Sequence, residues 1–454
     1  MSGRFVSVDR DTAYLLPPSV QEWLPENHLA RFVVEIVEQM DLGTLTTAYR
    51  GRGSDAFHPA MMVALLFYGY ATGVFSSRKL ERETYDSVAF RYVAANRHPD
   101  HDTIAHFRKR FLKELSALFV QILNVAQHMG VLKLGHVSLD GTKVHANASK
   151  HSALSWEHAC KIEAQLQAEV EQLMGLAEEA DQAEIPDGMS VPEELERREE
   201  RLAAIAQAKA AIEARAAERY AREQAAYEQK MAERKAKEES SGRKPGGSAP
   251  SEPQPGPRAK DQVNLTDADS RIMPTAGGGF EQAYNAQAAV DVDTMLVVAQ
   301  HVSQHPNDKQ EVEPALENLD AVAVVIGNAE ALIADTGYFS AANVEACHAH
   351  EVEPYIATGR DAHYPALAER LSEPSPVAED ASAVDRMKHR LRTPEGRKVY
   401  ATRKCTVEPT FGIIKSVLGF RQFLLRGLQA VQHEWTLVCI GWNLKRLHRL
   451  QRAV

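Results

Sequence analysis

Hydrophobic side chains recur every three or four residues through residues 1–128, which is the spacing of amphipathic α-helices. Pro59 is expected to begin an apolar helix that Gly73 ends, and Asp102 and Thr103 could cap a later one. Short helices with basic exposed residues could form a helix-turn-helix-like DNA reader or a generic bundle, and the pattern leaves both open. The first amphipathic run, for which Asn27 is the candidate cap, comprises Leu29, Phe32, Val33, Ile36, Val37 and Met40.

The pattern changes at residues 135–139, where polar and apolar residues alternate and predict a β-strand with Asp140 at its end. The dipeptide Asp140-Gly141 is expected to turn or kink the chain before a second extended stretch at 143–146. The chain therefore passes from a helical region into a sheet at about residue 131.

Strands and helices follow one another again after residue 262, which predicts a mixed α/β core with helices covering a sheet. Residues 322–326 fit either a strand or the end of a helix, and both assignments stay open. Residues 360–394 are polar and contain proline, so a loop is expected there. The predicted strands span 283–290, 294–302, 331–334 and 354–357, and the predicted helices 312–322, 341–349 and 429–447.

Residues 151–240 are rich in Ala, Glu, Gln, Lys and Arg, which favour helices. An Ile-Pro-Asp-Gly break at 185–188 divides them into two long runs and predicts an antiparallel hairpin, although the apolar spacing is too irregular for a strict heptad coiled coil. Residues 242–257 read as a Gly/Pro/Ser-rich linker. The predicted domains are N-terminal helices at 1–128, the first core strands at 129–150, the hairpin insertion with its linker at 151–261, and the remaining core with basic C-terminal helices at 262–454.

Composition narrows the class of protein. A chain of 454 residues with 44% hydrophobic content is not wholly disordered and suggests two or three domains. The four cysteines are scattered, which excludes a disulfide scaffold. The 18 histidines lack the spacing of zinc ligands, which argues against a zinc site. No leader is visible, and the longest apolar stretch falls short of the ~20 residues that cross a bilayer. We therefore expect a cytoplasmic protein with no membrane partner.

The net charge of −10 hides an uneven distribution. Residues 151–262 carry 16 Lys and Arg against 23 Asp and Glu, whereas residues 384–454 carry 15 against 4. A basic segment of this kind suits binding to a phosphate backbone, although a solvated helical surface would have the same composition.

Three acidic residues stand where chemistry could occur. Asp140 and Asp335 each end a predicted strand, where ligands gather in α/β sheets, although both segments also suit ordinary turns. Glu408 would share a helix face with Lys404 and Lys415 if one helix spans the segment, whereas a helix beginning at the next residue, a proline, would leave Lys404 outside. Ordinary pairing with a lysine would also explain Glu408. A site that binds both a metal and a phosphate would need this mixture of charges.

Three segments resemble the acidic motifs of insertion-sequence DDE transposases: 139–143 (Leu-Asp-Gly-Thr-Lys), 333–338 (Ile-Ala-Asp-Thr-Gly-Tyr) and 407–415. The family's third motif is usually written Tyr-x2-Arg-x3-Glu-x6-Lys. This chain keeps Glu408 and Lys415 at that spacing, whereas Tyr400 and Arg403 stand one residue further upstream. Other segments similar to the same group lie at 57–59 with 76–78, at 100–104 and at 284–287.

The resemblance implies an RNase H-like catalytic core of the retroviral-integrase type. It further implies that Asp140, Asp335 and Glu408 form a carboxylate triad that holds two Mg²⁺ or Mn²⁺ ions, which prefer oxygen ligands. Water would then nick the ends of the element, and each freed 3′-hydroxyl would attack target DNA without a covalent enzyme intermediate.

The same resemblance implies the DNA contacts. Lys415, and with it Lys404, Arg403 and Tyr400, would contact phosphates beside the scissile bond. The N-terminal domain would read terminal inverted repeats in double-stranded DNA, and a homodimer would hold both ends in the bacterial cytoplasm, at the nucleoid. The insertion could clamp DNA or support dimer assembly, and its negative charge favours a protein partner.

Two other functions remain open at this stage. A stand-alone metal-dependent nuclease of the same fold would cut DNA without joining it. A DNA-binding or scaffold protein derived from an inactivated transposase would use the basic C-terminal segment and the helical hairpin. The presence of all three acidic residues counts against inactivation.

Overall fold

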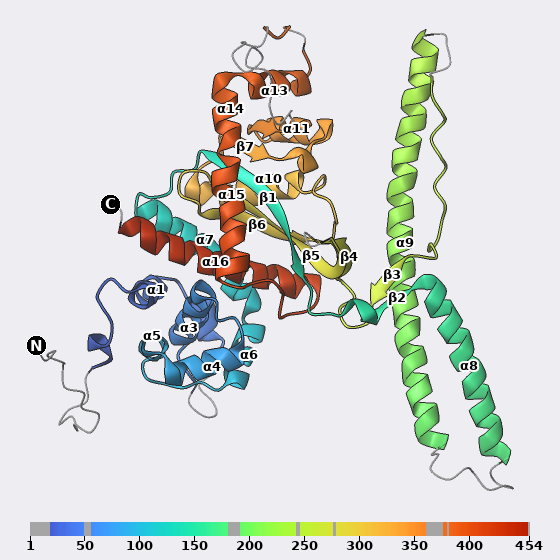
Figure 1. Cartoon of the computed structure of the whole chain (residues 1–454), viewed down its shortest axis with the longest axis horizontal. Helices are drawn as coiled ribbons and strands as arrows, with labels where there is room; N and C mark the ends of the chain where they lie inside the picture. The colour runs from blue at the N-terminus through green and yellow to red at the C-terminus, as the bar shows by residue number, and fades with distance from the viewer. Residues whose placement is uncertain are drawn as a thin grey trace, which may run out of the picture.

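The computed structural model describes residues 19–49, 56–179, 191–241, 246–275, 278–359, 376–378 and 381–452. Figure 1 shows a group of N-terminal helices, a core in which helices cover a sheet, and a long helical hairpin that extends to one side. The predicted break at 185–188, part of the predicted linker and much of the predicted loop at 360–394 lie outside the described residues.

The N-terminal region is helical, as predicted. Gly73 ends α3 with a φ of 84°, a left-handed conformation that glycine adopts without strain. Two caps differ from the prediction: His28 rather than Asn27 caps α1, and Asp100 rather than Asp102 caps α6, because their side chains accept the first-turn N–H groups. The helices are α1 (Leu29–Glu38), α2 (Gly43–Thr47), α3 (Pro59–Thr72), α4 (Ser77–Asp86), α5 (Val88–Val93), α6 (His101–Arg110) and α7 (Leu112–His128).

The core is mixed α/β. Among the described residues, six strands form one sheet in the order β4-β5-β1-β7-β8, with β6 also paired to β5. The central strand β1 runs antiparallel to β5 and parallel to β7, and β7 runs parallel to β8. The strands are β1 (His136–His145), β4 (Arg271–Pro274), β5 (Phe280–Asp291), β6 (Val297–Ser303), β7 (Ala331–Ala334) and β8 (Glu353–Ile356).

The prediction that the first strand ends at Asp140 is wrong, because β1 continues without a turn to His145. Strand β5 pairs with every residue of β1 from Val137 onward, which holds the Asp-Gly dipeptide extended. Gly141 lies opposite Gln287, and a Cβ added to Gly141 would lie 2.2 Å from the Nε2 of that side chain. The glycine therefore marks a close approach between strands and not a turn.

The C-terminal half agrees with the predicted order, with one open alternative resolved and one correction. Residues 322–326 belong to a helix, and a helix capped by Ser382 occupies 383–392, inside the predicted loop. Pro409 lies within a helix that begins at Arg403 and continues as a π-helical turn at Ile413–Val417. The helices are α10 (Val312–Ile326), η3 (Thr336–Tyr338), α11 (Ala341–Ala349), α13 (Ala383–Arg392), α14 (Pro394–Ala401), α15 (Arg403–Gly412) and α16 (Leu428–Gln451).

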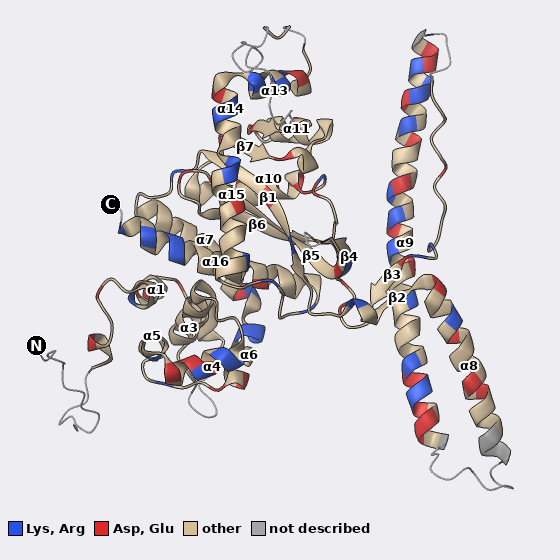
Figure 2. Ribbon diagram, in the orientation of Figure 1, with Lys and Arg blue, Asp and Glu red and all other residues tan. Residues whose placement is uncertain are grey.

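The predicted hairpin consists of α8 (Trp156–Glu179) and the longer α9 (Val191–Ser241), which pack against each other. A two-stranded sheet of β2 (Ala153–Ser155) and β3 (Gln262–Asn264) closes its base. Basic and acidic residues alternate along both helices (Figure 2), so most of the hairpin is a solvated surface of mixed charge. Its own small apolar cluster includes Leu154, Leu166, Ile205, Ile212 and Val263.

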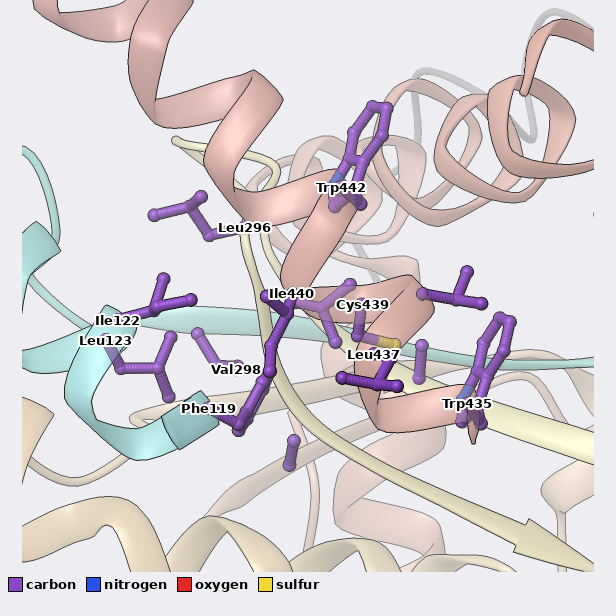
Figure 3. Close-up of a cluster of buried hydrophobic side chains, with 14 of the residues drawn as sticks. Phe119, Ile122, Leu123, Leu296, Val298, Trp435, Leu437, Cys439, Ile440 and Trp442 are labelled. Atoms are coloured by element: carbon purple, nitrogen blue, oxygen red, sulfur yellow. The ribbon is translucent and has the colours of Figure 1, made fainter. Parts of the chain in front are cut away.

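Helix α16 joins the N-terminal helices to the sheet. It packs against α3 and α7 on one side and against β6 on the other. Figure 3 shows Leu437 and Ile440 of α16 together with Phe119 of α7 and Val298 of β6. All of these side chains are buried, and they belong to one continuous apolar core that also includes residues of α1 and α3. The N-terminal helices and the sheet therefore fold around a shared interior.

No single helix in the described part of the chain is long and apolar enough to cross a membrane. The pair α3 and α4 passes by length and composition only when taken together, and it is bent by 96°.

The shared interior predicts a strong effect of Gly441→Ala. A Cβ at this position of α16 would lie 2.7 Å from the carbonyl carbon of Tyr70 and 2.8 Å from the nitrogen of Ala71, both backbone atoms that cannot rotate away. We expect the free energy of unfolding, measured by urea denaturation, to fall by about 1–3 kcal/mol. The matched control is Gly412→Ala in α15, where the added Cβ meets no atom within 4 Å and should stabilise by about 0.4–1 kcal/mol. Equal effects of the two substitutions would contradict the close approach of α16 to α3.

Candidate active site

The parallel pairing of β1 with β7 places two acidic residues beside each other. Ser138 is paired with Ile333. Asp140 lies two residues further along β1, and Asp335 lies two residues further along the chain, directly after the end of β7 and still in an extended conformation. Because side chains alternate along a strand, both carboxylates project from the same face of the sheet. The Oδ1 atom of Asp335 also accepts the N–H of Gly337 at 2.7 Å, which caps η3 and fixes the turn after β7.

The surroundings of Asp140 are unfavourable for its charge. Burial raises the pKa of Asp140 to about 6, and the nearby carboxylates of Asp335 and Asp308 also raise it. The N–H of Gly141, which donates to Oδ1 at 2.8 Å, and the cation of Arg403 oppose this shift. The site therefore holds negative charges that are only partly compensated.

Arg403 links the two halves of the site. Its Nη1 lies 3.5 Å from Oδ2 of Asp140, and its Nη2 lies 2.8 Å from Oε1 of Glu408. The arginine side chain is 16% exposed, whereas that of Glu408 is 46% exposed. Helix α15 thus brings Glu408 to the sheet through Arg403, and the ion pair of Glu408 is with this arginine and not with a lysine.

The three other residues predicted to contact DNA lie at different distances from this centre. Lys415 donates from Nζ to the carbonyl oxygen of Lys143 on β1 at 2.6 Å, and burial lowers its pKa. Lys404 is exposed on α15. Tyr400 is half-buried and belongs to the preceding helix, α14. Lys415 is therefore anchored to β1, the strand that carries Asp140, whereas Lys404 and Tyr400 belong to the helices α15 and α14.

Asp308 is a further residue of the site that the sequence analysis did not identify. Its Oδ1 accepts from Nδ2 of Asn285 at 2.7 Å, from Nε2 of Gln287 at 2.8 Å and from Nζ of Lys143 at 3.4 Å. Gln287 in turn accepts the hydroxyl of Tyr338 at 2.5 Å through Oε1. The only signal was the turn Pro-Asn-Asp at 306–308, which predicts a helix start and says nothing of the sheet.

This network connects the strands that carry the acidic residues. Asn285 and Gln287 lie on β5, Lys143 lies on β1, and Tyr338 follows β7 in η3. The fully buried Asn285 has no hydrogen-bond partner for its Oδ1, which points at the Gly141 position, 2.9 Å from where a Cβ would be. Asp308 therefore fixes the relative positions of the three strands next to Asp140 and Asp335.

The donor set fits a hard divalent cation in its chemistry, because it consists of carboxylate oxygens with excess negative charge. Within the described ranges, however, no three His, Cys, Asp or Glu side chains are grouped closely enough to hold one ion. The guanidinium of Arg403 lies between Asp140 and Glu408 and supplies the positive charge that they face.

Two family models match the chain. One, described as a Transposase domain (DUF772), matches residues 18–110, and the other, described as a Transposase DDE domain, matches residues 260–444. The second match contains Asp335, Arg403, Glu408 and Lys415, whereas Asp140 and the hairpin lie between the two matches. No curated protein and no solved structure matches the chain significantly.

Removing the Asp308 carboxylate is expected to destabilise the fold. Asp308→Ala would leave the amide donors of Asn285 and Gln287 and the ammonium of Lys143 without their shared acceptor. The free energy of unfolding, measured by urea denaturation, should fall by about 1–3 kcal/mol. Glu317→Ala, on the exposed face of α10, is the matched loss of one acidic side chain and should change it by less than about 0.5 kcal/mol. A variant of Asp308 as stable as the control would show that the network is not structural.

Proposed function

Because the chain belongs to the insertion-sequence DDE transposases, we propose that it binds the terminal inverted repeats of its element, nicks the ends and joins the freed 3′-hydroxyls to target DNA. The observation that carries this proposal is that Asp140 of β1 and Asp335, directly after the parallel strand β7, are close enough to interact electrostatically, with Glu408 linked to Asp140 through Arg403.

Asp140, Asp335 and Glu408 are the residues that would hold two divalent cations, Mg²⁺ or Mn²⁺. The support is the uncompensated negative charge at Asp140, which a bound cation would relieve. Bound ions of this kind activate the attacking oxygen and stabilise the leaving oxygen of an in-line displacement.

The protein's own residues orient these carboxylates and supply positive charge for the substrate. The hydrogen bond from Gly337 and the network of Tyr338, Gln287 and Asp308 hold the Asp335 turn in one conformation. Arg403 partly compensates the charges of Asp140 and Glu408 in this structure, and its planar guanidinium is suited to a phosphate oxygen when those carboxylates bind cations. Lys415, Lys404 and Tyr400 would contact phosphates beside the scissile bond.

The wider organisation follows from the same function. The curled mixed sheet is consistent with an RNase H-like core, and the N-terminal helices would read the terminal repeats. Joining needs both ends at once, so two copies of the chain would act together on DNA in the cytoplasm. Joining of pre-cut ends to target DNA would distinguish this function from that of a nuclease, which only cuts. Nicking of uncut ends would distinguish it from that of an inactive scaffold protein.

The first test is Asp335→Asn. The amide oxygen can still accept the Gly337 N–H, so the turn should persist while the charge is lost. We expect nicking of terminal-repeat DNA with Mg²⁺ to fall at least about 10³-fold, the order of magnitude for losing one group that stabilises transition-state charge, while the dissociation constant for DNA changes little. Asp293→Asn, at an exposed turn between β5 and β6, should nick normally. Substantial nicking by the Asp335 variant would reject the carboxylate assignment.

Metal binding can be tested without DNA. Because cations would bind the folded carboxylates, Mn²⁺ should raise the thermal midpoint of the wild-type protein, and excess chelator should reverse the rise. The Asp335→Asn variant should show a much smaller rise, whereas Asp293→Asn should match the wild type. An equal rise in all three proteins would place the bound metal elsewhere.

A further inference from the structure

A cationic cavity lies where the hairpin joins the core, away from the carboxylates. It has a volume of about 300 Å³ and is bordered by α9, by the segment leading into β3, by β4 and by the chain after β6. Figure 1 shows the corresponding junction, where α9 passes beside β3 close to the end of β4. The cavity is therefore formed by the insertion and the catalytic core together.

The lining is strongly basic. It contains Arg215 and Arg219 of α9, Lys260, and Arg271 of β4. Among the described lining residues the single acid is Asp261, which is already occupied because it accepts from Nη1 of Arg219 at 2.8 Å. Although the hairpin and its linker are acidic overall, their base is locally positive.

Two of these cations are held next to each other. Arg271 donates from Nη1 to the carbonyl oxygen of Ala268 at 3.0 Å, and Arg215 donates to the same oxygen from Nη2. Burial, together with the neighbouring charge of Arg215, lowers the pKa of Arg271 to about 10. The two like charges therefore share one carbonyl oxygen, and the carboxylate of Asp269, which acts on both arginines, compensates them only in part. A bound anion would stabilise this arrangement further.

A third arginine has an unused donor at the same place. Nε of Arg219 is buried and has no hydrogen-bond partner, although its two terminal nitrogens bond Asp261 and the carbonyl oxygen of Gly256. A buried donor without a partner is unusual in a folded protein, and this one belongs to a residue that lines the cavity. Arginine forks suit phosphate oxygens in particular, because they can donate two parallel hydrogen bonds.

The cavity is connected to the active site through a short stretch of chain. Gln304 and Pro306 border it, and Gln304 donates from Nε2 to the carbonyl oxygen of Asp269. Asp308, which lies beside Asp140, is only two residues beyond Pro306, a span of at most about 7 Å. A DNA strand that occupies the carboxylate site can therefore also reach this cavity.

We propose that this cavity binds a backbone phosphate of the DNA on which the carboxylates act, held by Arg215 and Arg271. The inference rests on the proposed function and deepens it, because it makes the base of the insertion a DNA contact. The sequence left open whether the insertion clamps DNA or supports dimer assembly, and the negative charge of the insertion favoured a protein partner, whereas the proposal gives the base of the insertion a DNA contact. The distal parts of α8 and α9, with their mixed charge, remain free for other contacts.

The experiment measures the affinity for an element-end duplex as a function of salt. Loss of one phosphate contact lowers the slope of log K against log salt by about 0.9, which corresponds to about fivefold weaker binding near 0.15 M salt. Arg215→Gln and Arg271→Gln should each show this loss, equally for specific and unrelated sequences. Arg271→Lys should recover most of the slope, because the positive charge is retained. Arg222→Gln, an exposed arginine of the same helix that does not border the cavity, should leave the slope unchanged.

Controls separate the possible failures. Circular dichroism and the thermal midpoint identify a variant that does not fold, and Arg215→Gln decides the outcome if Arg271→Gln is unfolded. A folded Arg215→Gln with the wild-type slope overturns the proposal, as does weaker binding with an unchanged slope, which would indicate a structural role. If the wild-type protein does not bind DNA at all, the proposed function itself fails.

A final experiment distinguishes binding of a DNA phosphate in the cavity from binding of a free phosphate ion. At constant ionic strength, a short duplex should raise the thermal midpoint of the wild-type protein more than that of Arg215→Gln, while inorganic phosphate should affect both equally. A rise with inorganic phosphate that requires Arg215, together with an unchanged salt slope for DNA, would assign the cavity to a small anion and overturn the DNA contact.

Discussion

Two carboxylates that lie side by side in a partly buried place repel each other, and the sheet holds them there against that repulsion. The backbone of Asp140 is held by its pairing with β5, and Asp335 is held directly after β7 by the hydrogen bond that it accepts from Gly337. The repulsion appears as the raised pKa of Asp140, and Arg403 offsets part of it. Positive charge from an ion or from an arginine is therefore what the centre of this fold requires.

Strand β5 and helix α16 stabilise the arrangement of Asp140 and Asp335 through a polar network around Asp308. Strand β5 contributes Asn285 and Gln287, whose amides converge on Asp308, and Trp435 of α16 donates from its ring nitrogen to the carbonyl oxygen of Gln287 at 2.9 Å. Helix α16 is buried on nearly all sides, between the sheet and α3 and α7. The polar network thus packs against the apolar core around α16, which limits how far its members can shift.

Local patterns predicted the elements whose boundaries depend on nearby residues. The apolar strand at 331–334 and the helix at 341–349 have the predicted bounds, because turn residues and a capping serine delimit them. The Asp-Gly dipeptide of β1 was misread as a turn, since its conformation is set by β5, which lies more than a hundred residues away in the chain. Asp308 and the arginine cavity were missed for the same reason. The residues that contact Asp308 and those that line the cavity come together only when the sheet and the insertion have folded. The spacing of these residues in the sequence does not indicate that they will be close.

The continuous interior beneath α16 has a geometric consequence for how DNA would be measured. The N-terminal helices and the sheet share one hydrophobic core, because Tyr70 of α3 and the sheet pack against the same helix, α16. In the proposed function, this shared core would keep a fixed distance between the helices that bind the repeat and the carboxylates. The number of base pairs between the recognised repeat and the cleaved bond would then be set by the dimensions of the protein and not by the sequence of the intervening bases.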